Sequence, residues 1–419
     1  MSISNEKIST KRVILTGIIG NTMEWYDFAL YGYFASVIGD NFFPSADPTS
    51  SLLAAFAAFA AGFVVRPFGG LFFGRIGDIF GRERALQLSI IFMACPTILM
   101  AIAPTYSQIG IFASIVIVIL RLLQGLSVGG EYTSSIIFLC EQAPKHRRGL
   151  YAIWGLWGSV LGMLLGSSIG ALITQLVLPE NLSIWGWRIP FALGSIVAVT
   201  GLLLRKGLKL KVNNIMINNP IKVTLTSHLG DVIKVMLLNV ASSVVFYLAF
   251  VYDVNYIEVY DGINKRNTLS LNTEIMIILL LLYPISAWIS DRIGRRPMFL
   301  LGTGWLLFGS VPIFRLIHST NTSEIFRGEI ALAIAVALLA GAKNAANVEL
   351  MPAEVRCTGL ALAFNAAEGW FGGTTPLLAV WLITITGNVM IPSILSILAA
   401  LITLITSVVF TKESAFSEL

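Results

Sequence analysis

The sequence predicts an all-α membrane protein whose twelve transmembrane helices form two pseudo-symmetric six-helix bundles. Hydrophobic residues make up 56% of the 419-residue chain and charged residues only 12%, whereas a soluble domain carries about 25% charge. The apolar residues come in blocks of about 20, the length that crosses a bilayer as a helix. Two charged motifs also recur half a chain later, which indicates a duplicated unit.

One long polar stretch, residues 205–233, separates the first six apolar blocks from the last six. Residues 1–204 are therefore predicted to form an N-terminal bundle, and residues 234–419 a C-terminal bundle, joined by a cytoplasmic loop. The predicted spans are 13–38, 52–73, 86–103, 111–141, 150–176, 188–204, 234–258, 271–289, 298–317, 328–350, 358–384 and 389–411.

Lys and Arg residues orient these spans. When successive loops are assigned to alternate sides, 19 of the 28 Lys and Arg residues fall on the side of the two termini and 4 on the other side. Positive residues favour the cytoplasmic side of a membrane. We therefore expect both termini and the loop 205–233 to lie in the cytoplasm.

Composition and motifs exclude several function classes. The sequence pI is about 9.1, but it comes from loop residues that set topology, and no nucleic-acid-binding motif accompanies it. Cys95, Cys140 and Cys357 lie in or beside apolar blocks without pairing or metal-ligand spacing, so we expect buried free thiols. No phosphate-binding glycine loop is present, which argues against ATP drive. We expect no metal, no cofactor and no enzymatic activity.

The first repeated motif reads "GRIGDIFGRER" at 74–84 and "AWISDRIGRR" at 287–296, at an offset of 213 residues. We expect each copy to form a tight cytoplasmic turn in which glycine supplies backbone freedom and the aspartate pairs with arginine or faces a helix N-terminus. The turns would then latch the two halves together in one conformation; the alternative is a basic turn that only sets topology. The residues concerned are Gly74, Asp78, Gly81, Arg82, Asp291, Arg292, Gly294, Arg295 and Arg296.

The second repeated motif has the pattern Glu-x-x-Pro-x-x-x-Arg and an offset of 208 residues. It reads "EQAPKHRR" at 141–148 and "ELMPAEVR" at 349–356. Two independent matches at nearly the same offset indicate a duplicated six-helix unit, a construction that transporters use with their substrate site between the halves. The shared positions are Glu141, Pro144 and Arg148 in the first copy, and Glu349, Pro352 and Arg356 in the second.

Four segments together resemble the major facilitator superfamily, and within it the metabolite:proton symporters: "RPFGGLFFGRIGDIFGRERAL", "RLLQGLSVGGEYTSS", "WGWRIPFALG" and "SDRIGRRP". The resemblance covers essentially the whole chain. "EWYDFALYGY" and "FFPSADPT" are most similar to proline/betaine transporters, while "GWRIPFALG" and "FGGTTP" are equally similar to the dicarboxylate members. The resemblance implies the major facilitator fold, with helices 3, 6, 9 and 12 outside a central cavity.

Charged residues inside the predicted spans point to the polar site, because each costs roughly 2.5–3.5 kcal/mol at a helix centre. The interiors of spans 3, 6, 9 and 12 carry none, so we expect those helices to face lipid. The other spans hold Glu24, Asp27, Arg66, Arg121, Glu131, Lys343 and Glu368.

Glu24 and Asp27 lie three residues apart near the middle of the first span, so they are expected to share a helix face. Two acids in one confined site raise each other's proton affinity, which favours a role in proton coupling. The alternative is that one acid is a permanently ionised partner of an arginine. Glu131 is the third candidate for proton coupling; alternatively, it pairs with Arg66.

Arg121 is a candidate to bind a substrate carboxylate or to pair with an acid of the first span. Lys343 is expected to neutralise Glu349 or Glu368, or to contact an anionic substrate, and the ion pair is the preferred option. Aromatic residues could form a cage for a quaternary ammonium group by cation–π attraction, or could simply pack. The candidate substrate-binding residues are Tyr26, Tyr31, Arg121, Gln124, Trp154 and Trp370; the candidate intramembrane ion-pair residues are Arg66, Lys343 and Glu368.

The resulting hypothesis is a secondary active transporter that carries a small organic solute together with protons by alternating access. A proline/betaine-type zwitterion is favoured; a dicarboxylate of the α-ketoglutarate or citrate type, or uncoupled transport on the same fold, are the alternatives. A membrane enzyme and a non-transporting sensor are disfavoured. We expect a monomer in the bacterial inner membrane.

Overall fold

The computed structural model describes residues 10–46, 48–205, 219–253 and 265–415. Within them the chain is mainly helical, and each of the twelve predicted spans contains helix; the end of the seventh span, 254–258, lies outside the described residues. The first six spans correspond to α1 (Thr10–Tyr33) with α2 (Ala35–Phe42), α3 (Pro48–Phe80), α4 (Arg82–Ile102), α6 (Ile111–Gln142), α7 (Arg148–Leu176) and α9 (Arg188–Arg205). The last six correspond to α11 (Leu229–Tyr247) with η3 (Leu248–Tyr252), α13 (Lys265–Ile293), α14 (Arg295–Ile317), α15 (Thr322–Leu350), α16 (Arg356–Ala366) with η5 (Ala367–Gly372) and α17 (Thr375–Thr386), and α18 (Ile391–Ile405) with η6 (Thr406–Phe410).

Eight of the described helices are long and apolar enough, each by itself, to cross a bilayer. Two further predicted spans, 13–38 and 358–384, are divided into consecutive helical segments. The remaining described elements are short: α5 (Tyr106–Ile109), η1 (Lys145–Arg147), α8 (Pro179–Asn181), η2 (Leu182–Gly186), α10 (Pro220–Ser227) and η4 (Ala353–Val355).

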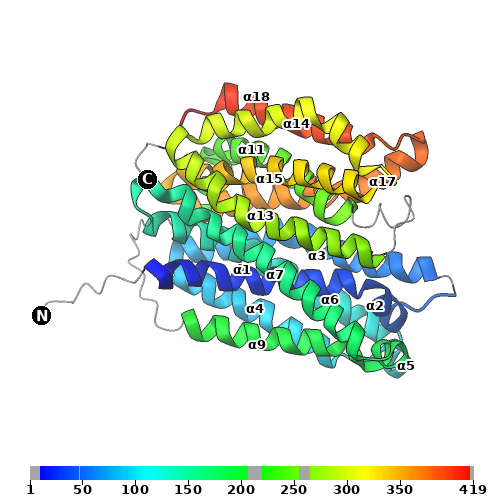
Figure 1. Cartoon of the computed structure of the whole chain (residues 1–419). Coiled ribbons are helices and arrows are strands. Elements are labelled where there is room, and N and C mark those ends of the chain that lie inside the picture. The colour runs from blue at the N-terminus through cyan, green and yellow to red at the C-terminus, as the bar shows by residue number, and fades with distance from the viewer. Residues whose placement is uncertain (1–9, 47, 206–218, 254–264, 416–419) are drawn as a thin grey trace, which may run out of the picture.

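Several helix pairs pack across the boundary between the bundles, and two of them make the most extensive contact. α3 packs against α16, and α7 packs against α13. Figure 1 shows α14 and α18 along one edge of the molecule and α4 and α9 along the opposite edge. These four helices correspond to spans 3, 6, 9 and 12, which the sequence predicted to lie outside the cavity.

Glycines bring the helices of the N-terminal bundle into backbone contact. A Cβ atom at Gly129 of α6 would lie 2.2 Å from the carbonyl oxygen of Arg66 on α3, and one at Gly162 of α7 would lie 2.2 Å from that of Thr22 on α1. Such distances exclude any side chain, so small residues set the helix spacing. The polar residues of α1 and α3 are thereby held at fixed depths.

Part of the predicted loop 205–233 is helical. The segment 206–218 lies outside the described residues, but α10 follows it, with the side chain of Asn219 accepting a hydrogen bond from the Lys222 amide at its first turn. α10 contacts α3, α11, α16 and η4. It therefore touches helices of both bundles. α11 begins at Leu229, five residues before the predicted span.

The first repeated motif is more helical than predicted. α3 continues to Phe80 and α13 to Ile293, so Gly74, Asp78 and Asp291 lie on helices and not in loops. The turn narrows to one residue in each copy, Gly81 with φ of 93° and Gly294 with φ of 107°. Only glycine adopts these angles without strain. The helical extension places each aspartate in the last turns of its helix.

Candidate functional site

A cavity lined by charged and aromatic residues lies between the two bundles. Its twelve lining residues come from α1, α3, α6 and α7 of the first bundle and from α11, α15, α16 and η5 of the second. They border about 450 Å³ of space free of protein atoms, part of which is open to solvent. The residues are Glu24, Trp25, Arg66, Val128, Tyr132, Leu156, Ser159, Phe246, Lys343, Phe364, Asn365 and Glu368.

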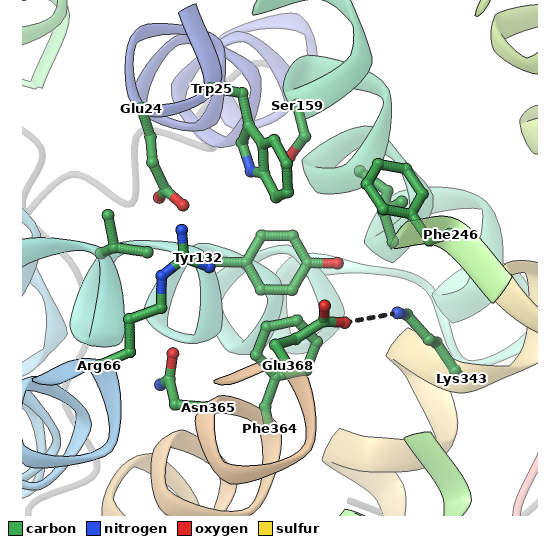
Figure 2. Close-up of a pocket in the computed structure, with 12 residues that line it drawn as sticks. Glu24, Trp25, Arg66, Tyr132, Ser159, Phe246, Lys343, Phe364, Asn365 and Glu368 are labelled. Carbon is green, nitrogen blue, oxygen red and sulfur yellow. Dashed lines mark hydrogen bonds and ion pairs between the residues drawn. The ribbon is translucent and has the colours of Figure 1, made fainter. Parts of the chain in front are cut away.

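Two acids and two bases are the charged residues of this lining. Glu24, Arg66, Lys343 and Glu368 are each at most 6% exposed. The Lys343 Nζ lies 3.2 Å from the Glu368 Oε1, which is one of the two pairings predicted for Lys343. In Figure 2 the Glu24 carboxylate and the Arg66 guanidinium both point into the cavity. With all four residues ionised, the lining carries no net charge.

Aromatic side chains form the walls between these charges. The rings of Tyr132 and Phe364 stack with centroids 4.5 Å apart, and those of Trp25 and Phe246 meet edge to face at 5.7 Å. The Lys343 ammonium lies 5.4 Å from the centre of the Phe364 ring. A cation is therefore already held between an aromatic face and a carboxylate.

A π-helical segment positions Glu368. The chain leaves α16 at Ala366, runs through η5 and resumes as α17 at Thr375. Such segments interrupt α-helices often at functional sites, because the extra residue per turn redirects the side chains that follow. Glu368, near the start of η5, lines the cavity, whereas Trp370 two residues later is 55% exposed.

Asp27 lies in a second buried polar cluster with Arg121. Its two carboxylate oxygens accept hydrogen bonds from the Thr97 hydroxyl at 2.9 Å and from the Arg121 Nη1 at 3.1 Å. Gln124 donates to the same Thr97 oxygen at 3.0 Å. The Arg121 guanidinium carbon lies 3.7 Å from the centre of the Tyr31 ring. This cluster joins α1, α4 and α6 within the first bundle.

Glu24 and Asp27 therefore do not share one confined site, contrary to the sequence prediction. About 60° separates them around the helix axis, and this is enough to aim Glu24 into the cavity and Asp27 at α4 and α6. Arg121 follows the second option that the sequence left open for it, an ion pair with an acid of the first span.

None of the six predicted substrate-binding residues lines the cavity. Tyr26 donates its hydroxyl hydrogen bond to the Pro190 carbonyl at 2.7 Å, and Tyr31 donates to the Ala55 carbonyl. Trp154 packs edge to face on Trp157 of the same helix. These aromatic residues pack between helices, and Trp370 faces outward.

The side chain of Glu131 lies outside the described residues, so the predicted Arg66–Glu131 pair does too.

The aspartate of the first motif binds the first turn of a helix in the other bundle. The Asp78 carboxylate accepts hydrogen bonds from the backbone amides of Cys357 and Thr358 at 3.2 and 2.9 Å, and from the Thr358 hydroxyl. A Cβ atom at Gly74 would lie 2.8 Å from the Cα of Thr358. Negative charge at a helix N-terminus is favourable, because the amides there lack partners within the helix.

Asp291 makes the symmetry-related contact. Its carboxylate oxygens accept hydrogen bonds from the amides of Gly149 and Leu150 at the start of α7, at 2.8 and 2.9 Å. It also accepts from the Arg295 Nη1 at 2.8 Å. Each motif aspartate thus crosses to the opposite bundle and binds the beginning of its fifth helix.

The second motif supplies ion pairs at the same face. Arg356 lies 3.2 Å from Glu141, and Arg148 lies 3.8 Å from Glu349, so each pair links the two bundles. Arg295 lies 3.1 Å from Glu349 in addition. Pro144 and Pro352 precede the short helices η1 and η4 that lead into these arginines. The pairs Arg356–Glu141 and Arg148–Glu349 and the bonds of Asp78 and Asp291 together connect the two bundles at one face. We call this set of contacts the terminal latch, because the described chain ends at the same face (Figure 1).

The other residues of the first motif have local roles at this face. Arg292 stacks on Trp288 at 3.9 Å, and the amides of Arg295 and Arg296 donate to the Glu413 carboxylate near the end of the chain. The side chain of Arg82 lies outside the described residues. Glu413 lies after the last predicted span and outside both repeated motifs, so no sequence signal marked it.

Buried asparagines were also missed. Asn365 donates to the Gly129 carbonyl at 2.7 Å, and Asn344 accepts from the Tyr132 hydroxyl at 3.1 Å, so both link the bundles near the cavity. Asn239 and Asn347 bond each other through their amides. The "KNAAN" stretch in an apolar span was the available signal.

Among the described residues no cluster of histidine, cysteine and acidic side chains could hold a metal.

Comparisons with known proteins agree with this architecture. Residues 13–208 match the family model described as "Sugar (and other) transporter". The chain is 35% identical to the proline/betaine transporter of Escherichia coli K12 over 97% of its own length and 84% of the relative. It is 34% identical, with the same coverage, to the glycine betaine/proline/ectoine/pipecolic acid transporter OusA of Dickeya dadantii.

Solved structures are similar in fold at low sequence identity. The proton:xylose symporter XylE, a major facilitator superfamily protein, superposes with a TM-score of 0.78 at 18% identity and covers 94% of each chain. The human organic anion transporter MFSD10 gives a TM-score of 0.69 at 15% identity, covering 95% of this chain and 100% of that chain.

Proposed function

This chain belongs to the major facilitator superfamily, in the family of the proline/betaine transporters, and on that premise we propose that it carries a small zwitterionic solute across the membrane together with protons. The family makes it a transporter. Proline and betaine are the solutes in the names of its relatives, and they are the solutes that we propose for this chain.

The neutral cavity between the bundles is the observation that carries the choice of solute. A zwitterion adds no net charge to a lining with two acids and two bases, and its cationic group suits the aromatic walls. A dicarboxylate would add two negative charges to a site in which Glu24 and Glu368 already stand. Arg121 was a candidate to bind a substrate carboxylate, but it pairs with Asp27 and adds no positive charge to the cavity. The zwitterion is therefore favoured over the dicarboxylate alternative.

Glu24 is the acid that we propose for proton coupling. It lies in the cavity, where a proton and the solute could reach it by the same path, while Asp27 is held by Arg121 and Thr97. A carboxyl group that takes a proton when the solute binds would link the two movements. Asp27 then has a structural role.

The terminal latch supports alternating access. Its bonds join the bundles at one face of the molecule, and their release would let the two halves rock about the cavity. We propose that this face is cytoplasmic, following the distribution of Lys and Arg residues. We propose in addition that it is a multi-pass inner-membrane protein that functions as a monomer and needs no cofactor.

Uptake into liposomes tests this function. Purified protein in liposomes is offered radiolabelled glycine betaine, proline, α-ketoglutarate and citrate, each with and without an inward proton gradient. We expect the two zwitterions to accumulate above equilibrium only with the gradient. Accumulation of a dicarboxylate would establish that alternative, and gradient-independent equilibration of a zwitterion would establish uncoupled transport.

A further inference from the structure

We propose that Arg66 binds the carboxylate of the solute and thereby fixes the direction in which the solute lies in the cavity. This inference rests on the proposed function, because it takes the cavity between the bundles as the solute site. It adds a specificity-determining residue and an orientation, with the cationic end of the solute toward the second bundle.

The Arg66 guanidinium is held in one orientation. Its central carbon lies 3.9 Å from the centre of the Phe63 ring and 4.6 Å from that of Phe28. The backbone of Arg66 is fixed by its contact with Gly129, and the residue is 2% exposed. A planar cation packed against two neighbouring aromatic rings loses little freedom when it binds a ligand.

Two hydrogen-bond donors of this guanidinium have no acceptor among the described residues. The Nε and Nη2 atoms of Arg66 are buried, and within the described part of the chain they find no hydrogen-bond partner. Buried charged donors without acceptors are costly. These two atoms lie on the same edge of the guanidinium group, which is the geometry that binds both oxygens of one carboxylate. Figure 2 shows the group directed into the cavity.

The other cations near the site are already occupied. Lys343 is paired with Glu368, and Arg121 with Asp27. Among the described residues, Arg66 is therefore the base of the cavity lining that has two donors, Nε and Nη2, open to a ligand. Across the cavity, Lys343 already holds an ammonium group near the Phe364 ring and Glu368. The same surroundings, with Trp25 and Tyr132, would accept the ammonium group of the solute.

Competition binding with ligands that differ only in the carboxylate tests the assignment. Purified wild-type protein, Arg66→Gln and Arg66→Lys are titrated with glycine betaine and with choline, which has the trimethylammonium group but no carboxylate; proline and prolinamide form a second pair. The matched control is Arg315→Gln, the same change at an exposed arginine outside the cavity. Choline binding and a single size-exclusion peak report that each variant is folded.

We expect wild type and Arg315→Gln to prefer glycine betaine over choline. Arg66→Gln should lose about tenfold or more in affinity for glycine betaine with little change for choline, because a charge-assisted bond is removed from one ligand only. Arg66→Lys should fall between them. If Arg66→Gln keeps the wild-type preference, or weakens both ligands equally, the anchor assignment is wrong while the transport function stands. If wild type binds neither zwitterion, the proposed function and this inference both fail.

Discussion

Asp78 of α3 and Thr358 of α16 are bonded across the boundary between the two bundles, through the Thr358 amide at 2.9 Å and its hydroxyl group. Asp291 repeats this relationship with the start of α7. The duplicated sequence motif is thus a duplicated helix cap in which the cap and the helix belong to different halves. We expect that these bonds between the halves can break while each bundle stays folded.

Asp78→Asn should weaken the terminal latch. It removes the charge that interacts with the N-terminus of α16, worth about 1 kcal/mol or somewhat more in a partly buried site. The native Cys357 reports the opening, because it is buried beside Gly77 of α3. In a background with Cys95→Ser and Cys140→Ser, we expect Cys357 to react with N-ethylmaleimide about fivefold faster or more. Asp40→Asn, at an exposed acid, is the control; equal rates in all three proteins would refute the latch.

Glu24→Gln should separate binding from coupling. The amide keeps the size and polarity of the side chain but takes up no proton, so solute binding and solute exchange should persist. Accumulation driven by an inward proton gradient should be lost. Asp40→Asn again serves as the control. Normal gradient-driven accumulation by Glu24→Gln would show that another group couples the proton.

Lys343→Gln and Glu368→Gln should shift the charge preference of the cavity in opposite directions. The first leaves a net charge of −1 and should favour choline over glycine betaine, while the second leaves +1 and should favour carboxylates without an ammonium group. Each removes one partner of a buried ion pair, so a loss of stability accompanies the change. Competition binding measures both preferences. Identical ligand preferences in the two variants would contradict the neutral-cavity argument.

Asp27 and Arg121 should behave as a structural pair. Removing one partner of a buried pair costs about 3–5 kcal/mol, because the other charge stays buried and unpaired. Asp27→Asn and Arg121→Gln should therefore each lower the thermal stability of the purified protein strongly. The double variant should be less damaged than the sum of the two, and should retain gradient-driven uptake. A double variant that is stable but cannot accumulate solute would return Asp27 to the coupling mechanism.

The sequence predicted the fold and the charged part of the cavity, because both follow from strong local signals. Apolar blocks of membrane length and the distribution of charge give the twelve spans. Charge inside a span is costly, so Glu24, Arg66, Lys343 and Glu368 marked the helices that face one another.

Aromatic and neutral polar residues were harder to place. Trp370 and Trp154 occupy the expected helices but face away from the cavity, whereas Phe246 and Phe364 line it. The π-helical segment η5 rotates the residues around Glu368, and a regular helical period cannot anticipate this shift. The separation of Glu24 from Asp27 likewise depends on which neighbours the two sides of α1 meet.

A structure of the protein with glycine betaine or proline bound tests the central claim most directly. The account predicts solute density in the cavity between the bundles, with its carboxylate at Arg66 of the first bundle and its ammonium group beside Phe364 and Glu368 of the second. Density within a single bundle, such as at the Asp27–Arg121 cluster, would contradict it.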